Sequence, residues 1–250
     1  MIMALIYGYG YRYYYDPTYI LVLIGVVISL IASAKVKSTF ARYNKRQSAS
    51  GMTGAQAAER LLYAAGIQGV GVTHIAGNLT DNYNPSTGMV SLSDSVYNNS
   101  SIAALGVAAH EIGHVIQHDE GYGPLKLRST MVPVVNFGSS LSWILIVAGL
   151  VFVRYQFLLN LGILMFCLVV AFHLITLPVE FDASRRAIEL LDRSGILYGD
   201  ELKGSKKVLK AAGFTFVAGA LTAILQLLRL IILFGGRDRD LIGKHKRDNT

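Results

Sequence analysis

Four long stretches without a charged residue restrict how this 250-residue chain can fold. They are residues 17–34, 129–153, 155–179 and 211–228. Each is close to or above the length of about 20 residues with which a helix crosses the hydrocarbon core of a bilayer. In lipid the backbone must satisfy its own hydrogen bonds, which a helix does within one segment. The pattern predicts a mainly α-helical, polytopic membrane protein.

The composition agrees with this class. Hydrophobic residues make up 52% of the chain and charged residues only 16%, whereas about a quarter of an ordinary soluble domain is charged. The formal net charge is +7, but the basic residues cluster beside the apolar stretches. We therefore expect membrane lipids as partners through their anionic headgroups, and no nucleic acid. The single cysteine, Cys167, cannot form an internal disulfide, so no oxidising compartment is implied.

Charges at the ends of the stretches predict the topology. Five basic residues lie between positions 35 and 46, so the positive-inside rule places this end of the first span in the cytoplasm. Residues 129–179 are expected to form a transmembrane hairpin, which returns the chain to the same side. The last stretch contains Gln226 and is followed by Arg229, so three or four spans are compatible with the sequence.

The sequence His110-Glu111-Ile112-Gly113-His114 is an H-E-x-x-H motif. Residues four apart lie on one face of a helix, so His110 and His114 can direct two imidazoles at one metal ion. Glu111 can accept a proton from a water at that metal. This is the arrangement of a zinc metalloprotease, provided that the helix forms and a third ligand arrives from elsewhere in the chain.

The context of the motif favours a metal site over a surface helix with two solvated histidines. Residues 102–109 are wholly apolar, Ser100 or Ser101 can cap the helix, and Gly121 or Gly123 can end it. A His-Glu-His group on an apolar, buried helix needs compensation for its lost hydration, and a metal ion supplies it.

The third ligand is expected after the hairpin. Pro178 is predicted to end the second arm, and Glu180 is the first carboxylate beyond it, with Asp182 as the competitor. Asp119 and Glu120 are nearer in sequence, but they continue the motif helix and point away from the metal. We therefore predict that His110, His114 and Glu180 bind Zn²⁺, and that Glu111 is the catalytic base.

Two short strands are expected ahead of the motif helix, at residues 70–75 and 88–93. The edge of the second strand could bind an extended peptide substrate, although a plain structural hairpin explains its pattern as well. A donor for the oxyanion could come from Arg185, Arg186 or His118, and the two arginines also suit headgroup anchors. His74 and His173 are expected to be structural.

These elements divide the chain into six predicted parts. They are an N-terminal segment with the first transmembrane helix (1–34), a cytoplasmic zincin-like region with a small β element and the HEIGH helix (35–128), the transmembrane hairpin (129–179), a cytoplasmic helix with the third zinc ligand (180–210), a last transmembrane or membrane-associated helix (211–236) and a basic tail (237–250). We expect a multi-pass protein of the cell membrane whose active site faces the cytoplasm.

Three separated blocks carry a family resemblance. They are SGMTGAQAAERLL from Ser50, GNLTDNYNPSTGMVSLSDSVYNNSSIAALGVAAHEIGHVIQH from Gly77 and PVEFDASRRAIELL from Pro178. In them the chain resembles the bacterial membrane zinc peptidases of the YugP type, which are neutral zinc metallopeptidases. The resemblance covers most of residues 20–235. It implies a zinc-dependent endopeptidase that acts on peptides or proteins.

The chain departs from the related patterns at two places. The family's D-H-Y-D-P has Asn82 at its histidine position. Similar membrane zinc peptidases carry E-x-x-x-D after the motif helix, whereas here Glu180 is followed by Ser184. The resemblance then leaves Asp182 or a backbone carbonyl to orient a histidine.

A second class of function is compatible with the same residues. A membrane scaffold protein could use a structural zinc without turnover, but such a site takes four protein ligands. The fourth would be His118, Asp182 or His74. A transporter is disfavoured because the uncharged stretches contain almost no ionisable residues.

Overall fold

The computed structural model describes residues 16–152 and 155–234. The element order is α1 (Tyr19–Asn44), α2 (Gly54–Ala64), β1 (Gly71–Ile75), β2 (Asn82–Asn84), β3 (Met89–Ser93), α3 (Ile102–Asp119), α4 (Gly123–Val151), α5 (Gln156–Arg193) and α6 (Gly199–Phe234). The tyrosine-rich N-terminus and the basic tail lie outside the described residues.

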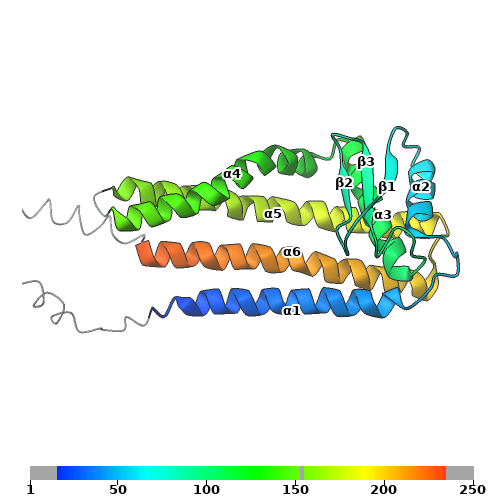
Figure 1. The fold of residues 1–250 in the computed structure, drawn as a ribbon, viewed down its shortest axis with the longest axis horizontal. Helices are drawn as coiled ribbons and strands as arrows, with labels where there is room; N and C mark the ends of the chain where they lie inside the picture. Colours follow the sequence, from blue (N-terminus) through cyan, green and yellow to red (C-terminus); the bar gives the residue numbers. More distant parts are fainter. Residues whose placement is uncertain (1–15, 153–154, 235–250) are drawn as a thin grey trace, which may run out of the picture.

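Four long helices run side by side, and a small module sits at one end of them (Figure 1). Helix α4 packs against α5, α5 against α6, and α6 against α1. All four are long and apolar enough to cross a membrane. The prediction of a mainly α-helical, multi-pass membrane protein is therefore confirmed, and α6 qualifies as a span by the same measures as the others.

The charge of Arg229 is accommodated where α6 meets the start of α1. Its guanidinium donates to Asp16 Oδ2 and to Thr18 Oγ1, each at 3.2 Å, and lies 4.4 Å from the ring centroid of Tyr19. A long side chain that reaches polar partners at a helix end does not leave its charge in hydrocarbon. This arginine is therefore compatible with a spanning helix.

Helix α5 does not end at Pro178, so that prediction is wrong. The helix continues unbroken through this proline to Arg193. Proline removes one backbone donor and crowds the carbonyl four residues earlier, but packing against neighbours tolerates this in membrane helices, and α5 packs against α3, α4 and α6. As a result, Glu180 lies on a direct extension of a membrane-spanning helix.

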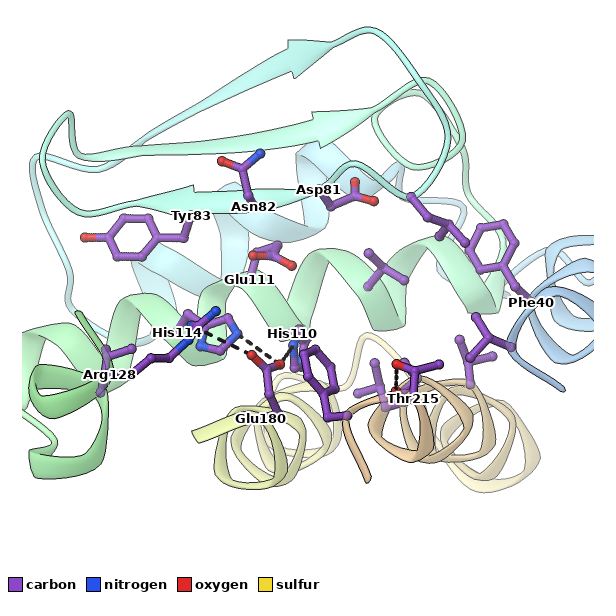
Figure 2. Close-up of a pocket in the computed structure, with 18 of the residues that line it drawn as sticks. Phe40, Asp81, Asn82, Tyr83, His110, Glu111, His114, Arg128, Glu180 and Thr215 are labelled. Atoms are coloured by element: carbon purple, nitrogen blue, oxygen red, sulfur yellow. Dashed lines mark hydrogen bonds and ion pairs between the residues drawn. The ribbon is translucent and has the colours of Figure 1, made fainter. Parts of the chain in front are cut away.

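The sheet has the order β1-β3-β2, with β1 parallel and β2 antiparallel to β3. Strand β3 is therefore central, and both of its edges are paired. The predicted free edge at residues 88–93 is wrong, and the structural hairpin is what forms. The outer strand next to α3 is β2, which pairs only with β3 among the described residues (Figure 2).

Helix α3 is the centre of the module. Ser101 is its cap, since its hydroxyl accepts from the backbone N–H of Ala104 at 3.1 Å. Leu105 and Ile112 are completely buried, and they belong to the core that α3 shares with α2, the sheet and the module ends of α5 and α6. The helix thus has a fixed start and a fully packed inner side.

Two glycines let α3 lie close to the membrane helices. A Cβ at Gly113 would be 2.4 Å from the carbonyl oxygen of Ala183 on α5, and one at Gly106 would be 2.3 Å from Ser205 Oγ on α6. These glycines are seven residues apart, and they face the same side of α3. Their missing side chains set the distance between the motif helix and the two spans.

We expect Gly113→Ala to destabilise the protein by about 1–3 kcal/mol, because the added methyl group must push backbone away from backbone. Thermal unfolding of the purified protein in detergent would show this as a melting temperature several degrees lower. Gly123→Ala is the matched control, since nothing lies within 4 Å of its added Cβ. Equal melting temperatures for the two variants would contradict close packing at Gly113.

Candidate metal centre

Helix α3 is open along one stripe. From Ile102 to Gln117 its residues are buried except Val107, His110, His114 and Ile116. The first three are spaced by three and four residues, so they lie on one face of the helix. Both histidine side chains of the motif therefore point to the same side of α3, and Figure 2 shows them directed toward α5.

The predicted metal ligands are brought together. His110 Nε2 lies 3.2 Å and His114 Nε2 3.6 Å from the same oxygen, Oε2 of Glu180. The three ligand atoms all lie within 4.8 Å of one another. A tetrahedral zinc ion with bonds of about 2.0–2.1 Å keeps its donors roughly 3.3 Å apart. Two imidazoles and one carboxylate at these separations fit zinc.

Arg128, near the start of α4, contacts the other oxygen of Glu180. Its Nη1 atom is 3.8 Å from Oε1 of this carboxylate, and Glu180 as a whole residue is 4% exposed. A buried carboxylate needs compensating charge, and here the imidazoles face one oxygen and the guanidinium the other. This contact could not be predicted from the sequence, because a basic residue at the end of an apolar stretch is typical of a headgroup anchor.

The orientation of His114 is fixed by Gln117. The side-chain amide of Gln117 donates from Nε2 to the carbonyl oxygen of Val179 at 2.8 Å and to Asp182 Oδ2 at 3.0 Å. Both partners are acceptors, so Oε1 of this amide must face His114 Nδ1, which lies 3.0 Å away. Nδ1 of His114 therefore carries the proton, and its Nε2 lone pair points toward the metal position.

His110 is held by a different group. Its Nδ1 lies 3.2 Å from the hydroxyl of Ser184, the residue at the place of the aspartate in E-x-x-x-D. The hydroxyl makes the contact itself, whereas Asp182 acts on the other histidine through Gln117. The contact of Gln117 with His114 was not predicted, although Gln117 lies three residues after His114 and thus on a neighbouring position of the same helix.

Glu111 is nearly enclosed, with 7% of its surface exposed. Burial raises the pKa of its carboxyl group above the usual value, against the opposing effect of His110 and His114. Its side chain points from α3 toward β2, beside the histidines (Figure 2). A carboxylate whose pKa is raised is suited to accept and return a proton.

These groups line a cleft of about 440 Å³ that runs along the open face of α3. Its walls come from five parts of the chain, which are α1, the segment around β2, the start of α4, α5 at Glu180 and α6. The polar groups gather around the histidines. The opposite part of the cleft, toward α1 and α6, is mostly apolar, with Thr215 as its polar member on α6.

Other residues singled out from the sequence lie elsewhere. His118 Nδ1 lies 3.2 Å from the hydroxyl of Tyr83, and His74 pairs with Asp94 at 2.7 Å. Arg185 and Arg186 both pair with Asp182. The side chains that line the cleft do not include His118 or either of these arginines, so none of the three predicted oxyanion donors is placed for that role.

The comparisons with known proteins agree with this geometry. Residues 18–235 match the family described as "Putative neutral zinc metallopeptidase". The chain belongs to this family of neutral zinc metallopeptidases. Over 214 residues it is 44% identical to a protein of Bacillus subtilis (strain 168) named "Putative membrane protease YugP", and the match covers 85% of this chain and 95% of that relative. No solved structure matches the chain.

Membership in the family identifies the metal as Zn²⁺, as predicted. The family description names zinc, and the positions of three side chains suit the same ion.

We expect Gln117→Leu to weaken zinc binding by roughly 10- to 100-fold, because the substitution releases the ring of His114 and its tautomer. Competition with a chromogenic chelator would measure the affinity. Gln68→Leu is the matched control, since Gln68 is exposed on the connection between α2 and β1. The role of Gln117 would be rejected if both variants bound zinc as tightly as the wild type.

Proposed function

We propose that this protein is a membrane-embedded, zinc-dependent endopeptidase. The observation that carries the proposal is the convergence of His110, His114 and Glu180 on one point beside Glu111, at the wall of a cleft. Three protein donors leave a coordination position of zinc available for water or substrate, as in catalytic zinc sites.

Bound zinc would polarise the scissile carbonyl and lower the pKa of a coordinated water toward roughly 7. Glu111 accepts the proton of the attacking water, and it later delivers this proton to the leaving amine. Gln117 and Ser184 hold the two imidazoles during this exchange. Arg128 replaces Arg185, Arg186 and His118 as the candidate donor to the developing oxyanion, since its guanidinium lines the cleft.

The substrate is a peptide segment in extended form. Strand β2 borders the cleft with Asn82 and Tyr83, and its outer side has no strand partner within residues 16–152 and 155–234. An extended chain can pair with such an edge and lie over the metal ligands. A cleft that runs along α3 with walls on several elements suits the binding of an extended stretch of a longer chain.

A scaffold with a structural zinc is the alternative, and the candidates for its fourth ligand are engaged elsewhere. His118 contacts Tyr83, His74 contacts Asp94, and Asp182 contacts Gln117 and two arginines. A closed structural site would also have no use for a buried carboxylate at Glu111. Both observations favour catalysis.

We further propose that the module faces the cytoplasm. Its end of α1 carries Lys35, Lys37 and Arg42 next to the apolar part of the helix, and Lys45 and Arg46 follow directly. The positive-inside rule places such clusters in the cytoplasm. The end of α4 and the start of α5 lie at the far end of the helices (Figure 1), so this orientation places them outside.

The catalytic role of Glu111 predicts that Glu111→Gln keeps its zinc but cleaves peptides about 10²- to 10⁴-fold more slowly, since the amide cannot accept the proton. Zinc content by elemental analysis and cleavage of casein or a peptide mixture in detergent would measure the two effects. Glu59→Gln changes an exposed glutamate of α2 in the same way and serves as the control.

Retained zinc together with unchanged cleavage in Glu111→Gln would reject this role. X-ray absorption spectra of the zinc-loaded protein would separate the two functions independently. Two imidazoles, one carboxylate and a water are expected, whereas four protein ligands would support the scaffold.

The orientation predicts which engineered cysteines a membrane-impermeant maleimide reaches in intact cells. In a Cys167→Ser background, Tyr155→Cys at the α4–α5 turn should be labelled, whereas Ser86→Cys in the β2–β3 turn should react only after the membrane is opened. Both positions are exposed. The reverse pattern would place the module outside the cell.

A further inference from the structure

The cleft continues beyond the zinc ligands into a part that we call the apolar limb. Its walls are side chains from three helices, which are Val36 and Phe40 of α1, Val107 of α3, and Val208, Ala212 and Phe216 of α6. None of these six side chains carries a charge or a hydrogen-bonding group. Two polar residues, Thr215 and Asp81, also line the cleft on this side, and both are engaged within the protein. The hydroxyl of Thr215 donates to the carbonyl oxygen of Ala212 at 2.7 Å, and Asp81 accepts from the backbone N–H and the hydroxyl of Ser93. The other part of the cleft is more polar, since it contains the histidines, Glu111 and Arg128.

The limb is part of the reaction face of α3. Val107 lies one turn before His110 on the open stripe of the helix, and it is the stripe's only apolar member. A substrate that lies along this stripe and reaches the zinc ligands must therefore also cover Val107. The residue that enters the limb is thus adjacent to the bond that is cut.

The direction of β2 indicates which side of that bond enters the limb. Tyr83 contacts His118 near the end of α3, and Figure 2 shows Asp81 toward Phe40 and Tyr83 toward His114. Strand β2 therefore runs in the same sense as α3. A substrate paired antiparallel to β2 runs the opposite way, from His114 toward Val107, so the residue after the scissile bond points to the limb.

The limb also lies at the level of the membrane surface. Its α1 residues follow the charge-free part of that helix, and its α6 residues lie where the charge-free stretch 211–228 begins. Lys35 on α1 and Lys210 on α6 are at the same level as the limb residues. A substrate residue in the limb is therefore held next to the headgroups.

From these observations we infer the substrate class: polypeptides that present a large apolar residue, at the membrane surface, directly after the bond to be cut. This inference rests on the proposed peptidase function. Apolar walls cannot compensate the lost hydration of a charged side chain, whereas each additional methylene of a substrate in an apolar pocket changes specificity by about 10-fold or more. The juxtamembrane end of a membrane-embedded segment has this composition.

The inference is tested with the zinc-loaded protein in detergent and a peptide mixture in which the residue after the cut is varied. Mass spectrometry of the products gives the preference. We expect Leu, Phe or Met to exceed Asp and Lys by roughly tenfold or more. In Ala212→Phe the limb is partly filled, so cleavage before Phe and Leu should fall by about tenfold relative to cleavage before Ala.

Ala34→Phe is the matched control, because it makes the same change on an exposed position of α1 outside the cleft, and its profile should equal that of the wild type. Phe216→Ala is the complementary variant. It should increase cleavage before Trp, so the inference stays testable if Ala212→Phe does not fold. Cleavage without an apolar preference, or a preference that neither variant shifts, would overturn the inference.

A binding experiment separates this inference from the proposed function. Fluorescent peptides that differ only in the varied residue are titrated onto zinc-loaded Glu111→Gln, and their anisotropy is followed. Tighter binding of the Leu and Phe peptides, with no cleavage of any peptide by the wild type, would reject the peptidase but support the limb. Cleavage by the wild type with equal binding of apolar and charged peptides would reject the limb alone.

Discussion

The close contact between α3 and α5 is the constraint on which the site depends. Gly113 sits between the two histidines of the motif, and its backbone lies directly against Ala183. Ala183 is one helical turn from Glu180, so the contact that joins the helices also sets the distance from the carboxylate to the imidazoles. A larger residue at Gly113 would separate the donors. The glycine of the HEIGH sequence is thus a packing requirement of the metal centre.

This contact brings several ionisable groups into a poorly hydrated space. The surrounding residues therefore have to compensate for the lost hydration of their charges. Glu180 has imidazoles on one oxygen and Arg128 on the other. At Glu111, by contrast, burial raises the pKa of the carboxyl group against the weaker opposing effect of the two imidazoles. The difference separates two carboxylates with two roles. In the proposed reaction, Glu180 stays ionised and binds the metal, and Glu111 exchanges a proton. Zinc adds positive charge at their common boundary, so its binding also stabilises the assembled module.

The parts that the sequence predicted are those with a local signature. The H-E-x-x-H spacing defines a helix face, and the charge-free stretches define the spans. Glu180 was predictable because a hairpin must return the chain to the same side. Gln117 and Arg128 could not be recognised, since their roles depend on partners from other helices, namely Val179 and the far oxygen of the third ligand. The continuation of α5 through Pro178 and the pairing of both edges of β3 are likewise decided by tertiary contacts, which override the local preference of the sequence.

The residues of the site belong to two parts of the protein, the module and the membrane-spanning helices, which are held in position differently. This difference affects the choice of substrate. The histidines and Glu111 lie on α3, which belongs to the module, whereas the third donor and most of the apolar limb lie on helices that span the membrane. Helices in a bilayer are fixed in depth by their apolar length and by the basic residues at their ends. In the proposed peptidase, the depth of the scissile bond is therefore set by α1, α5 and α6, and not by the module. A soluble peptide and a membrane-bound segment with equal sequences meet this site differently, because only the second is already held at the depth of the cleft.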